Sequence, residues 1–110
     1  MEGVMSLDVS LMVDGREVYS ANITHNLGQM ARAAGIYMQL WRPSEIGCEY
    51  AKDIEDAIAL GLADMVARPS HYEQFDAENG WGTYRDFVPW IAKYLEALRK
   101  HPNAIIEVSI

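Results

Sequence analysis

Two alternating runs in the first quarter of the chain constrain the fold more than any other feature. Residues 7–13 place apolar side chains at every second position, and residues 17–24 do the same after Asp14-Gly15. A period of two is typical of a half-buried strand, and Asp-Gly between two such runs indicates a β-hairpin. We therefore expect paired strands over 7–13 and 17–24.

The turn of this hairpin poses a choice of register. A two-residue Asp14-Gly15 turn would set apolar side chains against polar ones, for example Val9 against Ser20. A three-residue loop that takes in Arg16 sets apolar against apolar, in the pairs Leu11–Tyr19, Val9–Ala21 and Leu7–Ile23. Because a one-residue slip exposes every core side chain, we predict the three-residue loop.

Helical patterns occupy the middle of the chain. Asn26 with Gln29 resembles a capping box and predicts a helix that Gly35 ends. An apolar stripe over 50–68 predicts a second helix, in which Gly61 indicates close packing. The strongest stripe follows the cap Thr83, and Pro89 inside it predicts either a kink or the true start of that helix. The segments between are predicted to be a short apolar turn at 36–41, a linker at 44–48 and one capped turn at 70–75.

Residues 104–110 alternate again and predict a third strand, which should join the same sheet because a lone hairpin is marginal. A chain of 110 residues with half of them apolar suits one domain, residues 1–110. The predicted fold class is α+β: a small antiparallel sheet, made of the N-terminal hairpin plus the C-terminal strand, with about three helices packed on one face.

Charge and composition exclude several classes of partner. The net charge is −7, and the nine Lys and Arg residues are scattered, so we expect no nucleic-acid partner. No run reaches the ~18 apolar residues of a transmembrane helix, so we expect no membrane partner. Residues 1–6 lack the basic start and apolar core of an export signal, and Cys48 is the only cysteine. We therefore expect a cytoplasmic protein.

The first candidate site holds four polar side chains, Asn22, Thr24, His25 and Asn26, where the second predicted strand passes into a helix. A helix N-terminus presents free N–H groups and can hold an anion. The alternative is structural, because Asn and Thr side chains commonly bond backbone groups in turns and caps, and His25 can satisfy a buried carbonyl.

The second candidate site is the loop Asn79–Tyr84. Trp81 and Tyr84 can stack on a flat ligand such as a nucleobase, and the loop glycines allow close backbone approach. The alternative is that both aromatic rings anchor the loop to the core. We predict that the two segments meet and line one pocket for a negatively charged, partly flat molecule, with ligand-binding residues Asn22, Thr24, His25, Asn26, Tyr37, Trp41, Asn79, Trp81 and Tyr84.

Metal and cofactor chemistry find little support. The three histidines are far apart, no HExxH or CxxC spacing occurs, and no phosphate-binding P-loop or GxGxxG is present. Cys48 with His25 as nucleophile and base lacks a local signature. We expect no metal and no cofactor.

Several short segments of this sequence resemble those of a family of short bacteriophage and prophage proteins. The two longest matching segments are Ala21–Gly28 and Asn79–Tyr84. Shorter matches include Ala34–Tyr37, Leu40–Pro43, Gly61-Leu62, Phe87–Pro89 and Tyr94-Leu95. The resemblance implies a phage or prophage context inside a bacterial host, and it implies no catalytic residue.

Two functions follow as hypotheses. The first is a non-enzymatic accessory protein that binds a small polar, nucleotide-like ligand or a host protein. The alternative is a small hydrolase with His25 as general acid or base, although no carboxylate adjoins His25 in the sequence. Because the small sheet has two unpaired edges, we also expect a homo-oligomer.

Overall fold

The computed structural model describes residues 6–110, and in it one antiparallel sheet carries a layer of helices. The strands are β1 (Ser6–Val13), β2 (Arg16–Thr24) and β3 (Ile105–Ser109), in the order β2-β1-β3. The predicted sheet of N-terminal hairpin plus C-terminal strand is therefore confirmed. The expectation that the first residues form no export signal lies, for Met1–Met5, outside the described residues.

The hairpin satisfies both of its sequence signals by means of a β-bulge. The predicted pairs are present: Leu11 lies opposite Tyr19, Val9 opposite Ala21 and Leu7 opposite Ile23. The predicted three-residue loop is wrong. Asp14 and Gly15, at φ 52° and 77°, form a two-residue turn, and Arg16 already pairs with Val13. The register shifts after Leu11, so Val18 is the extra residue on β2.

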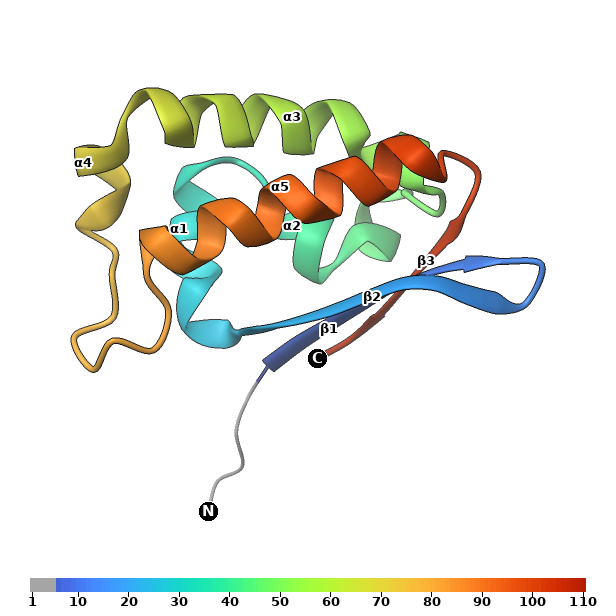
Figure 1. Cartoon of the computed structure of the whole chain (residues 1–110), viewed down its shortest axis with the longest axis horizontal. Helices are drawn as coiled ribbons and strands as arrows, with labels where there is room; N and C mark the ends of the chain where they lie inside the picture. Colours follow the sequence, from blue (N-terminus) through green and yellow to red (C-terminus); the bar gives the residue numbers. More distant parts are fainter. Residues whose placement is uncertain (1–5) are drawn as a thin grey trace, which may run out of the picture.

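All the helices lie on one side of the sheet (Figure 1). Two short elements, η1 (His25–Leu27) and α1 (Gly28–Ala33), follow β2, and α3 packs against α5 above them. The remaining bounds are α2 (Tyr37–Trp41), η2 (Pro43–Ile46), α3 (Ala51–Ala67), α4 (Pro69–Glu73) and α5 (Tyr84–Lys100). Within residues 6–110 no helix has the length and apolar character needed to cross a membrane.

The hydrophobic core lies between the sheet and this helical layer. Leu7, Val9 and Leu11 point inward from β1 and are fully buried. From the helices, the stripe of α5 contributes Phe87, Ile91 and Leu98, also fully buried. Alternation therefore leaves the polar side chains of β1 on the outer face of the sheet, as the sequence pattern requires.

Several local expectations need correction. Asn26 does not cap a helix; Thr24 Oγ1 accepts the Asn26 N–H at 3.2 Å, and α1 begins only at Gly28. Residues 37–41 form a helix rather than a turn, and much of the expected linker is the 3₁₀ helix η2. The capped turn at 70–75 is α4, which begins with Pro69 and has no side-chain cap. Pro43 and Pro69 supply the start signals of η2 and α4, because proline suits the first position of a helix.

Gly35 ends α1 as predicted, and it does so in a Schellman turn. The φ of Gly35 is 76°. The Gly35 N–H donates to the Arg32 carbonyl at 3.0 Å, and the Ile36 N–H donates to the Ala31 carbonyl at 3.0 Å. This turn sets Tyr37, the first residue of α2, beside Arg32 in the last turn of α1.

Gly61 provides the close approach that the sequence indicates. A Cβ at this position would lie 2.5 Å from Ile36 Cγ2 and 3.1 Å from the Ala34 carbonyl oxygen. The backbone of α3 therefore rests directly on the turn between α1 and α2.

Pro89 lies inside α5 and does not mark its start. Thr83 caps the helix, because its Oγ1 accepts the Asp86 N–H at 3.3 Å. Pro89 is on the exposed side of the helix, where water can satisfy the carbonyl that lacks a partner.

Candidate functional site

The two polar segments singled out in the sequence meet in the structure. The Asn26 side chain donates from Nδ2 to the Trp81 carbonyl oxygen at 2.8 Å. Beside this bond, a Cβ on Gly82 would lie 3.0 Å from Asn26 Cβ and 3.1 Å from Thr24 Cγ2, and the φ of Gly82 is 109°. Glycine is therefore required for the loop to approach η1 this closely.

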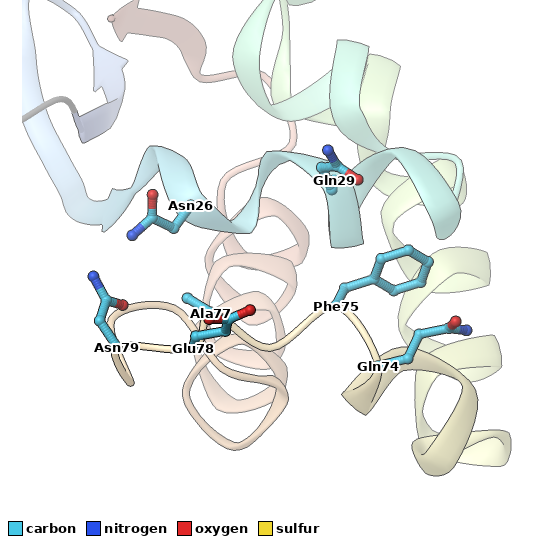
Figure 2. Close-up of a pocket in the computed structure, with 7 residues that line it drawn as sticks. All are labelled: Asn26, Gln29, Gln74, Phe75, Ala77, Glu78 and Asn79. Atoms are coloured by element: carbon cyan, nitrogen blue, oxygen red, sulfur yellow. The ribbon is translucent and has the colours of Figure 1, made fainter.

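A cavity of about 500 Å³ opens where the two segments meet (Figure 2). We call it the amide cavity, because four of its lining side chains are carboxamides. Asn26 and Gln29 line it from η1 and α1, and the chain after α4 supplies the other wall. The complete lining is Asn26, Gln29, Gln74, Phe75, Ala77, Glu78 and Asn79.

The loop wall of the cavity is held by its own hydrogen bonds. Asn79 Oδ1 accepts the Trp81 N–H at 2.9 Å, and the Ala77 N–H reaches the Gly82 carbonyl at 3.0 Å. Tyr84 anchors the end of the loop, since its hydroxyl donates to the Met65 carbonyl in α3 at 2.8 Å. Tyr84 thus has an anchoring contact, and it does not line the cavity.

The charge of the amide cavity disagrees with the expected anion. Among the described residues, Glu78 is the only charged one that lines it, and no Lys or Arg does. A carboxylate beside the opening repels an anion. The lining residues suit an uncharged or cationic molecule with several hydrogen-bonding groups, rather than the negatively charged one that the helix N-termini had indicated.

Asn22 and Thr24 make contacts within the sheet and the cap. Asn22 Nδ2 donates to Asp8 Oδ1 at 2.7 Å and to the Ser6 hydroxyl at 3.1 Å. Its carbonyl accepts the indole N–H of Trp90 at 3.0 Å. Neither Asn22 nor Thr24 lines the amide cavity.

His25 is bonded to Trp41, another residue of the predicted site. The Trp41 indole N–H donates to His25 Nδ1 at 2.7 Å, so neutral His25 carries its proton on Nε2. That Nε2 is buried and has no hydrogen-bond partner among residues 6–110. His25 therefore does not face the amide cavity, and Trp81, which is 64% exposed, does not line it either.

Tyr37 lines a separate cavity of about 630 Å³, which we call the arginine cavity. Its ring stacks on Trp41 with centroids 5.1 Å apart and planes at 11°. The complete lining is Arg32, Gly35, Tyr37, Met38, Gln39, Arg42 and Ile46. The two cavities share no lining residue.

Five residues that the sequence patterns did not predict also line the amide cavity: Gln29, Gln74, Phe75, Ala77 and Glu78. Gln29 follows Asn26 by three residues, and on a helix this spacing places two side chains on one face. That spacing was a usable signal. For Gln74 and Phe75 no such signal exists, because tertiary packing of α4 brings them to the cavity.

One ionic cluster joins α3 to α4 outside both cavities. The Arg68 guanidinium bonds Asp64 Oδ2 at 2.6 Å, and the Tyr72 hydroxyl donates to the same oxygen. Hydrogen bonds from Arg68 and then Tyr72 lower the pKa of Asp64 to about 2. Burial, followed by the bond to Asp64, raises the pKa of Tyr72. This cluster locks the junction of the two helices.

Among residues 6–110, no group of three or more His, Cys, Asp or Glu side chains is placed to hold a metal ion. No protein-family model, no curated protein and no solved structure matches this chain.

Proposed function

We propose that this protein binds a small polar molecule in the amide cavity and acts as a non-enzymatic accessory protein of a phage or prophage. The observation that carries the binding proposal is the convergence of Asn26, Gln29, Gln74 and Asn79 on one cavity. The phage context and the cytoplasm of a bacterial host rest on the sequence resemblance and on the single cysteine.

The lining favours a flat, uncharged ligand that carries both donors and acceptors. Asn26 Nδ2 bonds the Trp81 carbonyl, Asn79 Oδ1 accepts the Trp81 N–H, and Gln74 Nε2 bonds the His71 carbonyl. Among the described residues, Gln29 is therefore the carboxamide that keeps both its donor and its acceptor for a ligand, and this pair matches the hydrogen-bonding edge of a nucleobase. Phe75 offers an aromatic ring in the same lining, on which a base can stack. A nucleoside is therefore the ligand class that the cavity suits best, and the negative Glu78 disfavours a phosphate there.

NMR titration with adenosine, cytidine, guanosine and uridine tests this proposal. The side-chain NH₂ signals of Asn26, Gln29, Gln74 and Asn79 report on the cavity directly. We expect at least one nucleoside to shift these signals in a saturable manner. If all four leave them unchanged at about 10 mM, where even a weak complex with Kd near 1 mM would form, the nucleoside proposal is refuted.

A glutamine pair supplies the matched control. Gln29→Ala removes one carboxamide from the amide cavity, whereas Gln39→Ala removes one from the arginine cavity. We expect Gln29→Ala to weaken nucleoside binding by about tenfold, which is ~1.4 kcal/mol, and Gln39→Ala to leave it unchanged. Equal weakening in both variants would mean that the nucleoside binds elsewhere.

A host protein is the second candidate partner, and Trp81 is the observation that favours it. Its side chain is 64% exposed although it adjoins the buried Gly82. Exposed tryptophans are enriched at binding hot spots. If a host protein is the partner, Trp81→Ala should abolish complex formation with that protein, and Gln29→Ala should not.

The contacts of His25 weigh against the hydrolase hypothesis. A general acid or base must reach the reacting proton within hydrogen-bonding distance. Nδ1 of His25 is engaged by Trp41, and Nε2 is buried. We therefore do not assign His25 a catalytic role.

We further propose that two copies of the chain pair through β3. The outer edge of β2 is engaged by Trp90, which bonds the Asn22 carbonyl. On β3 the Ile106 N–H points away from β1, to the Glu49 carbonyl at 2.9 Å. Because these directions alternate along a strand, the N–H and C=O of Val108 also point outward, and they are available to a further strand.

An antiparallel pair centred on Val108 would suit the charges of β3. Val108 would face Val108 of the second copy, and Glu107 would face Ser109 of the second copy. A carboxylate can accept from a hydroxyl, so this register avoids the like-charge pair that two opposed glutamates would make. The two sheets would then form one continuous sheet, and the edge would be covered.

A further inference from the structure

We infer that the arginine cavity is a second binding site, which takes a flat organic anion such as an aromatic phosphate or carboxylate. This inference does not rest on the proposed function of the amide cavity, because the residues differ and so does the ligand chemistry. The evidence lies in the charge, the stacking and the backbone support of Arg32, Tyr37 and Arg42.

Positive charge is concentrated at this cavity in an otherwise acidic protein. The chain carries a net charge of −7, yet the described residues that line the arginine cavity include two arginines and no acidic side chain. None of the carboxylates of residues 6–110 lies within 4.0 Å of the Arg32 guanidinium, so its charge is not neutralised by an ion pair there. Arg42 is already paired with Glu45, Nη1 to Oε2 at 3.0 Å, so Arg32 supplies the unpaired positive charge with which an anion would interact.

Arg32 is held in place by an aromatic column rather than by a carboxylate. Its guanidinium carbon lies 3.8 Å from the centroid of the Tyr37 ring. The opposite face of Tyr37 stacks on Trp41, which is 2% exposed and therefore fixed in the core. A guanidinium stacked in this way keeps its N–H donors in plane, where they can bond an anion in a bidentate manner.

The backbone makes this arrangement rigid. The Schellman turn at Gly35 fixes the end of α1 relative to the start of α2, and thereby sets Arg32 over Tyr37. Gly28, at the start of α1, lies beside both side chains. A Cβ added there would be 3.6 Å from Tyr37 Cε1 and 3.7 Å from Arg32 Nη1, in ordinary van der Waals contact. Both side chains therefore pack against the first turn of α1.

The remaining lining residues define the rest of the ligand. Arg42 is held by the Glu45 carboxylate, and hydrogen bonding to Glu45 and then to Tyr37 raises its pKa. Gln39 adds an amide donor, while Met38 and Ile46 offer apolar surface. A volume of about 630 Å³ lies within the range of small-molecule sites. The anionic group can bond the in-plane N–H donors of Arg32, and the attached flat ring can then lie on the apolar surface of Met38 and Ile46.

Phenyl phosphate and benzoate are suitable probes, because neither contains the nucleoside that the amide cavity is proposed to bind. Backbone NMR signals of Gly35, Met38 and Gln39 report on the site, and those of the amide cavity serve as an internal reference. We expect phenyl phosphate to shift the first set and not the second. Comparison of phenyl phosphate with benzoate distinguishes a phosphate site from a carboxylate site.

Phenol and inorganic phosphate separate the two halves of the proposed ligand. We expect both to bind at least about tenfold more weakly than phenyl phosphate, since each lacks either the charge or the ring. If phenol binds as well as phenyl phosphate, the site recognises no anion and the inference is wrong. If inorganic phosphate binds equally well, the ring contributes nothing to binding and the inference of an aromatic ligand is wrong.

Substitutions of arginine complete the test. Arg32→Gln should weaken phenyl phosphate binding by about tenfold or more. Arg32→Lys should weaken it to a lesser extent, because lysine keeps the positive charge but lacks the planar guanidinium. Arg85→Gln is the matched control, since Arg85 is also exposed but lies at the start of α5. Thermal melts confirm that each variant folds. Equal weakening by Arg32→Gln and Arg85→Gln would show attraction to overall charge only, and would overturn the inference.

Discussion

The indole N–H of Trp41 donates to Nδ1 of His25 across 2.7 Å, and this bond ties the start of η1 to the end of α2. Trp41→Phe removes the donor and leaves the partly buried Nδ1 of His25 without that partner. We expect the free energy of unfolding to fall by about 1–3 kcal/mol in urea denaturation, part of it from lost ring volume. The double variant with His25→Leu isolates the hydrogen bond.

Trp81→Phe is the matched control for that substitution, because Trp81 is 64% exposed. Its free energy of unfolding should change by less than about 0.5 kcal/mol. Equal losses for Trp41→Phe and Trp81→Phe would show that the His25 contact does not stabilise the fold.

Gly61→Ala should destabilise the protein even though alanine is the better helix former. Helix propensity alone would favour alanine by about 1 kcal/mol. The added Cβ, however, would lie 2.5 Å from Ile36 Cγ2, and Ile36 is β-branched and fully buried. We expect a net loss of about 1–3 kcal/mol by chemical denaturation. A gain in stability would mean that α3 can move away from Ile36 at little cost.

Acid should weaken the junction of α3 and α4 through Asp64. Its folded-state pKa of about 2 lies below the ordinary value of 3.8, so the unfolded chain takes up the proton first. The contribution of Asp64 is therefore complete above the ordinary pKa, and it is lost as the pH falls towards 2. Between neutral pH and pH 2, the native protein should lose more stability than Asp64→Asn. Parallel pH profiles for the two proteins would contradict the assignment.

Val108→Pro should dissociate the proposed dimer without unfolding the subunit. Proline removes the outward N–H of Val108, and the ladder to β1 does not use that group. Sedimentation should then show a monomer, where the native protein shows a dimer at concentrations on the order of tens of micromolar. A native protein that is a monomer under these conditions would rule out the dimer.

Ser109→Pro provides the comparison on the same strand. By alternation, the Ser109 N–H points towards β1, so proline there should lower the melting temperature by breaking the sheet. If both proline variants unfold to the same extent, the assignment of inward and outward groups on β3 is wrong.

The hairpin shows how far local patterns predict this fold. The apolar alternation correctly predicted the pairs Leu7–Ile23, Val9–Ala21 and Leu11–Tyr19, and Asp14-Gly15 correctly marked the turn. The two signals conflict by one residue. The chain resolves the conflict with a bulge at Val18, which depends on the twist of the whole hairpin and leaves no mark in either pattern.

The site was predictable only in part. Both segments carry more polar side chains than their own turns and caps require. This excess correctly predicted that the segments of Asn26 and Asn79 meet. Their neighbours were harder, because Asn22 and His25 bond partners on other elements, Asp8 and Trp41. A sequence pattern shows which groups need partners, but the tertiary fold decides which partners they find.

Native mass spectrometry of the protein purified from a bacterial cytoplasm tests the central proposal, ligand binding in the amide cavity, most directly. We expect the native protein to carry a small molecule of defined mass, released on unfolding. Gln29→Ala and Asn79→Ala should lose that mass increment, and Gln39→Ala should keep it, because only the first two residues line the cavity. A native protein that carries no added mass, or an increment that survives both Gln29→Ala and Asn79→Ala, would contradict the proposal.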